Sequence, residues 1–143
     1  MLPILLIAVA IAIPPLPSWA NKVDCAEQQT NLDAKICTQR QFERADKELN
    51  AAYVEALKAA RQQDRYASEE PNPNRPGLEK LLRKAQREWV AFRDLNCDFH
   101  YNVYYGGSMA SLAYLACKLD MTKARAKELN AFVNLGEETS PQE

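Results

Sequence analysis

The sequence predicts a small all-α domain, in which a long N-terminal helix and an antiparallel helical hairpin are stapled by two disulfides. Three observations carry this prediction. Apolar residues recur at steps of three and four in three segments, as in helices that each bury one face. Two breaks separate these segments, a stretch with three prolines at 68–77 and a glycine pair at 106–107. Finally, the chain of 143 residues has four cysteines, all beyond residue 20.

The first 20 residues are predicted to be a secretory signal peptide. An apolar run at 2–13 is followed by three prolines, and Ser18 and Ala20 provide small side chains at positions −3 and −1 of a cleavage site. The segment lacks the usual Lys or Arg near its start. The alternative is an uncleaved membrane anchor, but the apolar run is shorter than the roughly 20 residues that a spanning helix needs. We expect cleavage between Ala20 and Asn21.

The first helix is predicted to run from a capping box to about residues 64–68. Thr30 and Asp33 stand three residues apart, so that each side chain can accept a hydrogen bond from a free amide of the first turn. The apolar stripe that follows should be buried: Phe42, Ala45, Leu49, Ala52, Tyr53, Ala56 and Ala60. Residues 68–77 are polar and rich in proline, which predicts a solvated connection, with a binding loop as the alternative.

The second helix is predicted to run from Pro76 to about Phe99. Its apolar face is predicted from helical spacing: Leu82, Ala85, Trp89, Phe92 and Phe99. We expect this helix to pack on the first one through Trp89 and Phe92. Gln86, Trp89 and Arg93 form a neighbouring stripe at i, i+3 and i+7. A helix with both a core face and a polar row is expected to stand in the middle of the fold.

The third helix is predicted to follow a chain reversal at Gly106-Gly107, because glycine permits backbone angles that other residues avoid. Ser108 suits the N-cap and Gly136 the C-terminal stop. The buried stripe between them should be Leu112, Leu115, Leu119, Thr122, Ala126 and Leu129. Residues 21–136 are thus expected to form one helical domain, and the polar residues 137–143 a disordered tail.

Four cysteines in an exported domain of this size predict two disulfides. Cys97 lies about as far before the glycine pair as Cys117 lies after it, so the two meet in an antiparallel hairpin. We therefore favour Cys97–Cys117, which leaves Cys25–Cys37, among the three connectivities that four cysteines allow. Long cysteine spacings and a single histidine argue against a zinc site.

Charge and residue types argue against several classes of function. A formal net charge of −1 gives no attraction to nucleic acid or to anionic lipid. Nucleophilic catalysis needs a Ser or Cys beside a base, yet His100 is the only histidine and the cysteines are expected to be paired. No spacing singles out a carboxylate pair among the 19 acidic residues, and the sequence has no phosphate loop or metal motif. We expect no catalytic residue, no cofactor and no metal.

Several motifs occur together and in order. Residues 46–53 match D-x-x-L-N-x-x-Y, and residues 86–97 match Q-x-x-W-x-x-[YF]-R-D-x-x-C. A G-G-S element at 106–108, Cys117 and R-x-x-E-L at 125–129 follow. Over residues 25 to 132 the chain therefore resembles the LprI-type lysozyme-inhibitor domain family of exported bacterial proteins, in which Cys25 and Cys37 also have counterparts. The founding type of that family is a lipoprotein, but the residues before Cys25 form no lipobox, so a soluble protein is expected.

The polar and aromatic residues of these motifs are interpreted as a network between helices. An arginine between helices needs carboxylate or carbonyl partners, and Asp46 is the expected partner of Arg93 or Arg125. The predicted members are Asp46, Asn50, Tyr53, Gln86, Trp89, Arg93, Asp94 and Arg125. The alternative interpretation of the same residues is a binding pocket.

The segment after the second helix is the stronger candidate for binding a partner. Tyrosine combines a large contact area with a polar tip, while Gly and Ser let a loop adapt. The predicted binding residues are Tyr101, Tyr104, Tyr105, Gly106, Gly107 and Ser108. The alternative is that the tyrosines fold back and cap the core.

The resemblance implies a periplasmic or secreted protein that blocks the muramidase cleft of lysozyme without chemistry of its own. Donors of the turn would then meet the catalytic carboxylates of such a cleft. The alternative function is a structural or stress-related envelope protein that binds another partner or self-associates through the same surface. A cell-wall enzyme ranks third. We expect no nucleic-acid partner and, after signal cleavage, no membrane partner.

Overall fold

The computed structural model describes residues 23–67 and 75–138, and within these ranges it contains three helices and no strand. They are α1 (Asn31–Ala67), α2 (Leu78–Val103) and α3 (Ala110–Glu138). The predicted all-α class is confirmed. The predicted signal peptide with its cleavage site at Ala20, most of the connection at 68–77 and residues 139–143 of the predicted tail lie outside the described residues.

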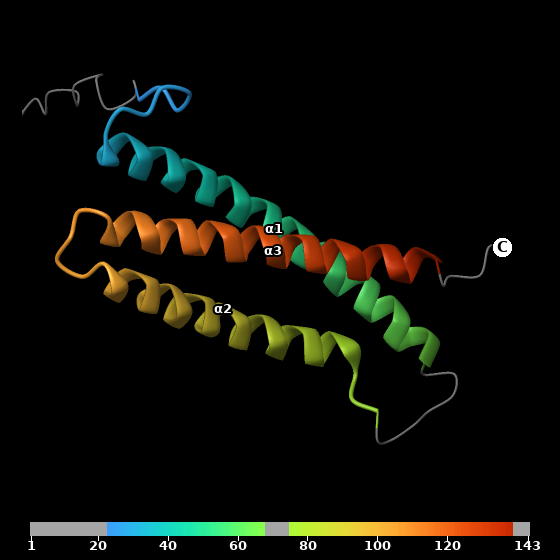
Figure 1. The fold of residues 1–143 in the computed structure, drawn as a ribbon. Helices are drawn as coiled ribbons and strands as arrows, with labels where there is room; N and C mark the ends of the chain where they lie inside the picture. The colour runs from blue at the N-terminus through green and yellow to red at the C-terminus, as the bar shows by residue number, and fades with distance from the viewer. Residues whose placement is uncertain (1–22, 68–74, 139–143) are drawn as a thin grey trace, which may run out of the picture.

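The middle of the bundle is α3, not α2 (Figure 1). The most extensive packing is between α1 and α3, followed by α2 with α3, and α1 touches α2 least. Figure 1 shows α1 crossing α3 and α2 running beside α3 in the opposite direction. The prediction that the second helix is the central element is therefore wrong.

Small side chains explain why α1 and α3 form the tightest pair. The buried residues of α1 are largely alanines, which let a facing helix approach closely: Ala45, Ala52, Ala56 and Ala60. Leu49 joins two of them and two residues of α3, Ala126 and Leu129, in one buried cluster. Leu82 and Trp89 of α2 reach this cluster from outside and are only partly buried.

The first helix begins at the predicted cap, whereas the second is capped by a residue that was not predicted. The capping box is present, because the Asp33 amide donates to Thr30 Oγ1 (3.1 Å) and the Thr30 amide donates to Asp33 Oδ2 (3.1 Å). The start of α2 is capped instead from α1. The Asp64 carboxylate accepts hydrogen bonds from the amides of Leu78 (2.8 Å) and Glu79 (3.0 Å). It therefore satisfies two of the amides that the first turn of a helix leaves free.

Three predicted boundaries are wrong by a few residues. Helix α2 continues one turn past Phe99 to Val103, and α3 passes through Gly136 to Glu138. Helix α3 begins at Ala110, two residues after the predicted N-cap, Ser108. The Ser108 hydroxyl is used elsewhere, since it accepts a hydrogen bond from the Asn31 side-chain amide (3.2 Å).

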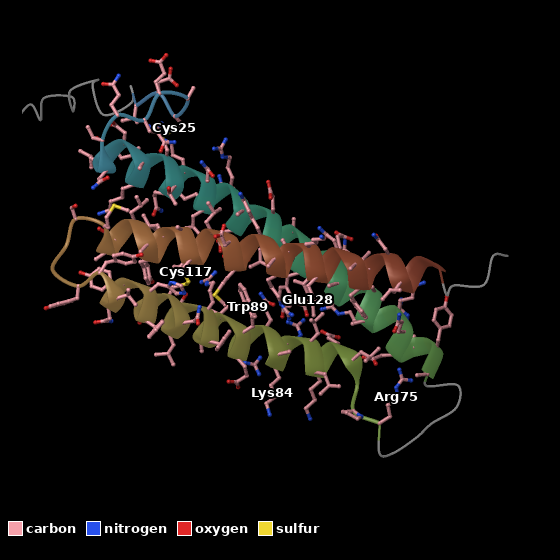
Figure 2. All side chains as sticks on the ribbon, in the orientation of Figure 1. Cys25, Arg75, Lys84, Trp89, Cys117 and Glu128 are labelled. Carbon is pink, nitrogen blue, oxygen red and sulfur yellow. A yellow bond between two sulfur atoms is a disulfide. The ribbon has the colours of Figure 1, made fainter. Side chains whose placement is uncertain are left out.

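Both predicted disulfides are present. Cys97 of α2 is bonded to Cys117 of α3, with 5.5 Å between their Cα atoms. Cys25 is bonded to Cys37, with 5.6 Å between Cα atoms, and holds the N-terminal segment against the first turns of α1. Both lie toward the end of the bundle where α2 turns into α3 (Figure 2). Such bonds persist in oxidising compartments, which indicates a location outside the cytoplasm. Within the described residues, no helix has the length and apolar character needed to cross a membrane.

Candidate functional site

Arg93 is the charged centre of the interface between helices. Its side chain points inward from α2 and the residue is only 6% exposed. The guanidinium donates from Nε to Asp94 Oδ1 (2.9 Å) and from Nη1 to Thr122 Oγ1 on α3 (3.2 Å). It also lies 3.8 Å from the Asp46 carboxylate of α1. One arginine thus connects all three helices, and its buried charge is compensated by two carboxylates.

Trp89 lies between two guanidinium groups. The Arg93 guanidinium carbon is 5.2 Å from the centre of the Trp89 ring, and that of Arg125 is 5.9 Å away. Arg125 is buried too, donates to Gln86 Oε1 (3.0 Å) and pairs with Glu128 (2.8 Å). Figure 2 shows Trp89 pointing from α2 into the bundle. Cation–π contacts of this kind favour a fixed ring between the two charges.

A second cation, Lys118 of α3, completes the cluster. Its ammonium lies 3.2 Å from Asp94 Oδ1 and 5.1 Å from the centre of the Phe42 ring. Partial burial by itself favours the protonated form of Asp94. The hydrogen bonds from Arg93 and Lys118, with their charges, outweigh that effect and hold the pKa of Asp94 below its ordinary value. Asp94 is thus a carboxylate shared by two cations.

The structure brings most of the predicted network residues together in two groups. Asp46, Arg93 and Asp94 form the first, which Asn50 joins by donating to Asp46 (3.2 Å). The second group consists of Gln86, Trp89 and Arg125. Tyr53 belongs to neither, since its ring packs against the hydrophobic cluster. Every buried side-chain nitrogen or oxygen among the described residues has a hydrogen-bond partner, and no group of three potential metal ligands occurs there.

The turn between α2 and α3 is short and internally hydrogen-bonded. The amides of Tyr104 and Tyr105 donate to the carbonyls of Tyr101 and Asn102 (both 3.2 Å), and the Gly107 amide donates to the Tyr104 carbonyl (3.0 Å). Gly106 has φ = +80°, a conformation that side chains with a Cβ rarely adopt. The reversal therefore depends on this glycine.

All six predicted binding residues are exposed. Tyr105 is the most open at 77%, and its ring meets that of Tyr101 edge-on with 6.4 Å between ring centres. Ser108 is exposed but anchored to Asn31 at the start of α1. The turn thus presents aromatic rings to solvent while its ends are held by the Cys97–Cys117 bridge and by α1. We name residues 101–108 the tyrosine turn.

The outer side of α2 continues this aromatic surface and corrects the predicted core. Phe92 is 59% exposed and Phe99 67% exposed, although both were expected to pack inward. Leu95, at 72%, and Val103 lie on the same side. Of the expected apolar face, Leu82 and Trp89 alone turn toward the cluster. The predicted inward face of α2 is therefore rotated about the helix axis from the observed one, because Arg93, Gln86 and Cys97 fill the inward positions.

Sequence reasoning missed two residues that matter for this arrangement and the hydrogen-bonding role of a third, Thr122. Lys118 and Thr122 supply α3's contacts to Asp94 and Arg93, and Asp64 caps α2. Thr122 was expected as a core residue only. The sequence gives a weak indication that Lys118 faces inward. It stands four residues before Thr122 and one after Cys117, which places it on the inward side of the hairpin. Nothing local to Asp64 indicates its partner 14 residues later.

The chain matches the family described as lysozyme inhibitor LprI over residues 24–129. This match covers most of the chain and includes both disulfides, the buried arginines and the tyrosine turn. The chain belongs to this family. The LprI match starts just before Cys25 and ends at Leu129, so it contains nearly all of the described helical domain.

Two relatives of the chain are described as uncharacterized proteins. An uncharacterized protein of Rhizobium meliloti (strain 1021), R02472, is 29% identical over 123 residues, which cover 86% of this chain and 88% of the relative. The uncharacterized protein YecT of Escherichia coli (strain K12) is 26% identical over 123 residues, covering 78% of this chain and 72% of YecT. No solved structure matches. The LprI family and the geometry of this chain are therefore the guides to its function.

Proposed function

We propose that this chain is an exported inhibitor that binds lysozyme and obstructs its muramidase cleft with the tyrosine turn. Membership of the LprI family carries the proposal, because inhibitors of lysozyme give that family its description. The inhibitor acts by occupancy alone, so it needs no catalytic group. Its two disulfides suit a periplasmic or secreted protein, which would meet lysozyme outside the cytoplasm.

The turn is the part of the molecule best suited to enter a cleft. It projects from one end of the bundle, and its tyrosines offer large area with a hydroxyl at the tip (Figure 1). Its internal hydrogen bonds and the neighbouring bridge at Cys97 limit its freedom before binding. A preordered loop loses less conformational entropy on association, which favours affinity.

Glycosidase clefts hold a pair of carboxylic groups, and this chemistry suggests what the turn meets there. The hydroxyls of Tyr104 and Tyr105 are donors that can approach a carboxylate from an exposed tip. The Ser108 hydroxyl is held by Asn31 and so lies nearer the base of the turn. We assign the tyrosines to contact and Ser108 to positioning.

The test is an assay of lysozyme-driven lysis of a cell-wall suspension in the presence of the mature chain from Asn21. Tyr105→Ala should weaken inhibition by about tenfold or more, as expected for loss of a central aromatic contact. The matched control is Tyr66→Ala, which removes an exposed tyrosine from α1 at the other end of the bundle. It should inhibit like the unsubstituted protein.

Two results would contradict the proposal. One is the absence of both inhibition and a complex on size exclusion when the chain is in excess over lysozyme. The other is full inhibition by Tyr105→Ala, which would leave lysozyme as the partner but remove the turn from the interface. Clearing of the suspension by the purified chain alone would instead support a cell-wall enzyme.

A second candidate function follows from the outer face of α2. An envelope protein that binds another protein or itself would use this broad apolar surface in addition to the turn. The exposure of Phe92, Leu95 and Phe99 favours this alternative, because isolated soluble proteins seldom expose neighbouring large apolar side chains in a row.

A further inference from the structure

The outer face of α2 carries a regular stripe along nearly the whole helix, which is apolar at every position but Glu88. Its members follow one another at alternating steps of four and three residues: Leu81, Ala85, Glu88, Phe92, Leu95 and Phe99. All six are exposed. A repeat of 3.5 residues is the spacing at which one helix packs along another in a coiled coil. Inside this molecule, α3 and α1 occupy only the opposite side of α2.

Charges beside the stripe are divided between the two halves of α2. The first half exposes Lys80, Lys84 and Arg87, and the second half carries Asp94 and Asp98. Within the part of the chain that the structure describes, none of Lys80, Lys84, Arg87 and Asp98 belongs to an ion pair. Figure 2 shows Lys84 pointing away from the bundle. A helix with a basic first half and an acidic second half complements a copy of itself that runs the other way.

We propose that the outer face of α2 is a self-association surface, on which a second copy of this chain packs with its α2 antiparallel. Such a dimer has one two-fold axis, so the same patch serves on both copies. With the axis beside residue 90, Leu81 packs on Phe99 of the second copy, and Ala85 packs on Leu95 of the second copy. Large side chains thereby meet smaller ones along the seam.

The same register places Lys84 opposite Asp98 of the second copy, twice by symmetry. In a coiled-coil seam, both residues stand directly beside the apolar stripe, where charges select partner and direction. Glu88 is the one charged member of the stripe and lies near the axis. It weakens the dimer and is expected to keep it reversible, because a charged group in an apolar seam costs stability. This surface is independent of lysozyme binding, and its test contains this chain alone.

The test is sedimentation equilibrium of the mature chain over a range of concentrations, with charge-reversed variants. Lys84→Glu and Asp98→Lys should each raise the dimer dissociation constant by about tenfold, since two attractive contacts become repulsive. A mixture of the two single variants should form mixed dimers with restored affinity, because each then faces the opposite charge. The double variant Lys84→Glu/Asp98→Lys should also dimerise like the unsubstituted chain.

The matched control is Lys123→Glu, which makes the same charge change on an exposed position of α3. It should leave the dissociation constant unchanged. Glu88→Leu should strengthen dimerisation. Circular dichroism of each variant separates loss of association from loss of fold.

Several outcomes would overturn the proposal. A chain that stays monomeric at about 1 mM lacks the interaction altogether. A dimer unaffected by both single charge reversals uses another surface, and a dimer not restored by mixing them has another direction or register. A monomer whose binding to lysozyme is abolished by Leu95→Lys would assign the stripe to that partner instead.

Discussion

The two sides of α2 differ in a way that runs against their chemistry. The inner side carries Arg93, Gln86 and Trp89, and the outer side carries Phe92, Leu95 and Phe99. The charged Arg93 is buried, whereas the three apolar residues are among the most exposed large apolar residues of the described chain. Burying an arginine while exposing three large apolar side chains is unfavourable for a protein that is alone in water. The arrangement is stable because Asp46 of α1 and Asp94 of α2 compensate the buried charge and Thr122 of α3 accepts a hydrogen bond from it.

This contrast separates what holds the fold from what remains available for contact. The inner side makes contacts within the molecule, since Arg93 reaches Asp46, Asp94 and Thr122, and Cys97 is bonded to Cys117. The outer side has no intramolecular role of comparable weight. An exposed apolar row that the fold does not need is best explained by a partner.

The largest expected effect comes from the inner side. Arg93→Ala should lower the free energy of unfolding by about 3 kcal/mol, because it leaves Asp46 and Asp94 without their shared cation and opens space beside Trp89. Urea unfolding followed by circular dichroism measures this change. A loss below about 0.5 kcal/mol, together with lost lysozyme binding, would make Arg93 part of a binding site instead.

A smaller effect is expected from acid. The pKa of Asp94 is lowered in the folded protein, so its contribution to stability is complete above its ordinary value of 3.8 and disappears as the pH falls through the folded value. Glu79, held by Arg61 and Arg83, behaves likewise, and its pKa falls from 4.5 to about 2.

Stability should therefore decrease between about pH 5 and pH 2. Asp94→Asn should flatten this decrease when unfolding is measured at several pH values. An Asp94→Asn variant with an unchanged slope would show that Asp94 is not held by its two cations.

Much of the fold could be predicted from the sequence because its signals are local. Alanines and Leu49 at helical spacing identified the buried stripe of α1, and the Thr30–Asp33 box identified its start. The spacing of Cys97 and Cys117 about Gly106-Gly107 identified the hairpin and one bridge. Each of these signals depends on residues within one segment or symmetrically placed about one turn.

The orientation of α2 could not be predicted in the same way. Hydrophobic periodicity assigns Phe92 and Phe99 to the core and Arg93 to its edge, because it scores each side chain as if it were alone. Besides the adjacent Asp94, the buried arginine relies on Asp46 from α1 and Thr122 from α3, which are remote in sequence. The Gly-rich turn left open whether the tyrosines would be exposed or fold back onto the core. They are exposed, and their surface extends along α2 because of this rotation.

The central claim is that the outer side of α2 belongs to contacts with other molecules and not to the core. The most direct measurement is the free energy of unfolding of Leu95→Lys at a concentration low enough to keep the chain monomeric. We predict a value within about 0.5 kcal/mol of the unsubstituted protein, as for other exposed positions. A loss of about 3 kcal/mol or more, as expected for a charge placed in a packed interior, would contradict the account.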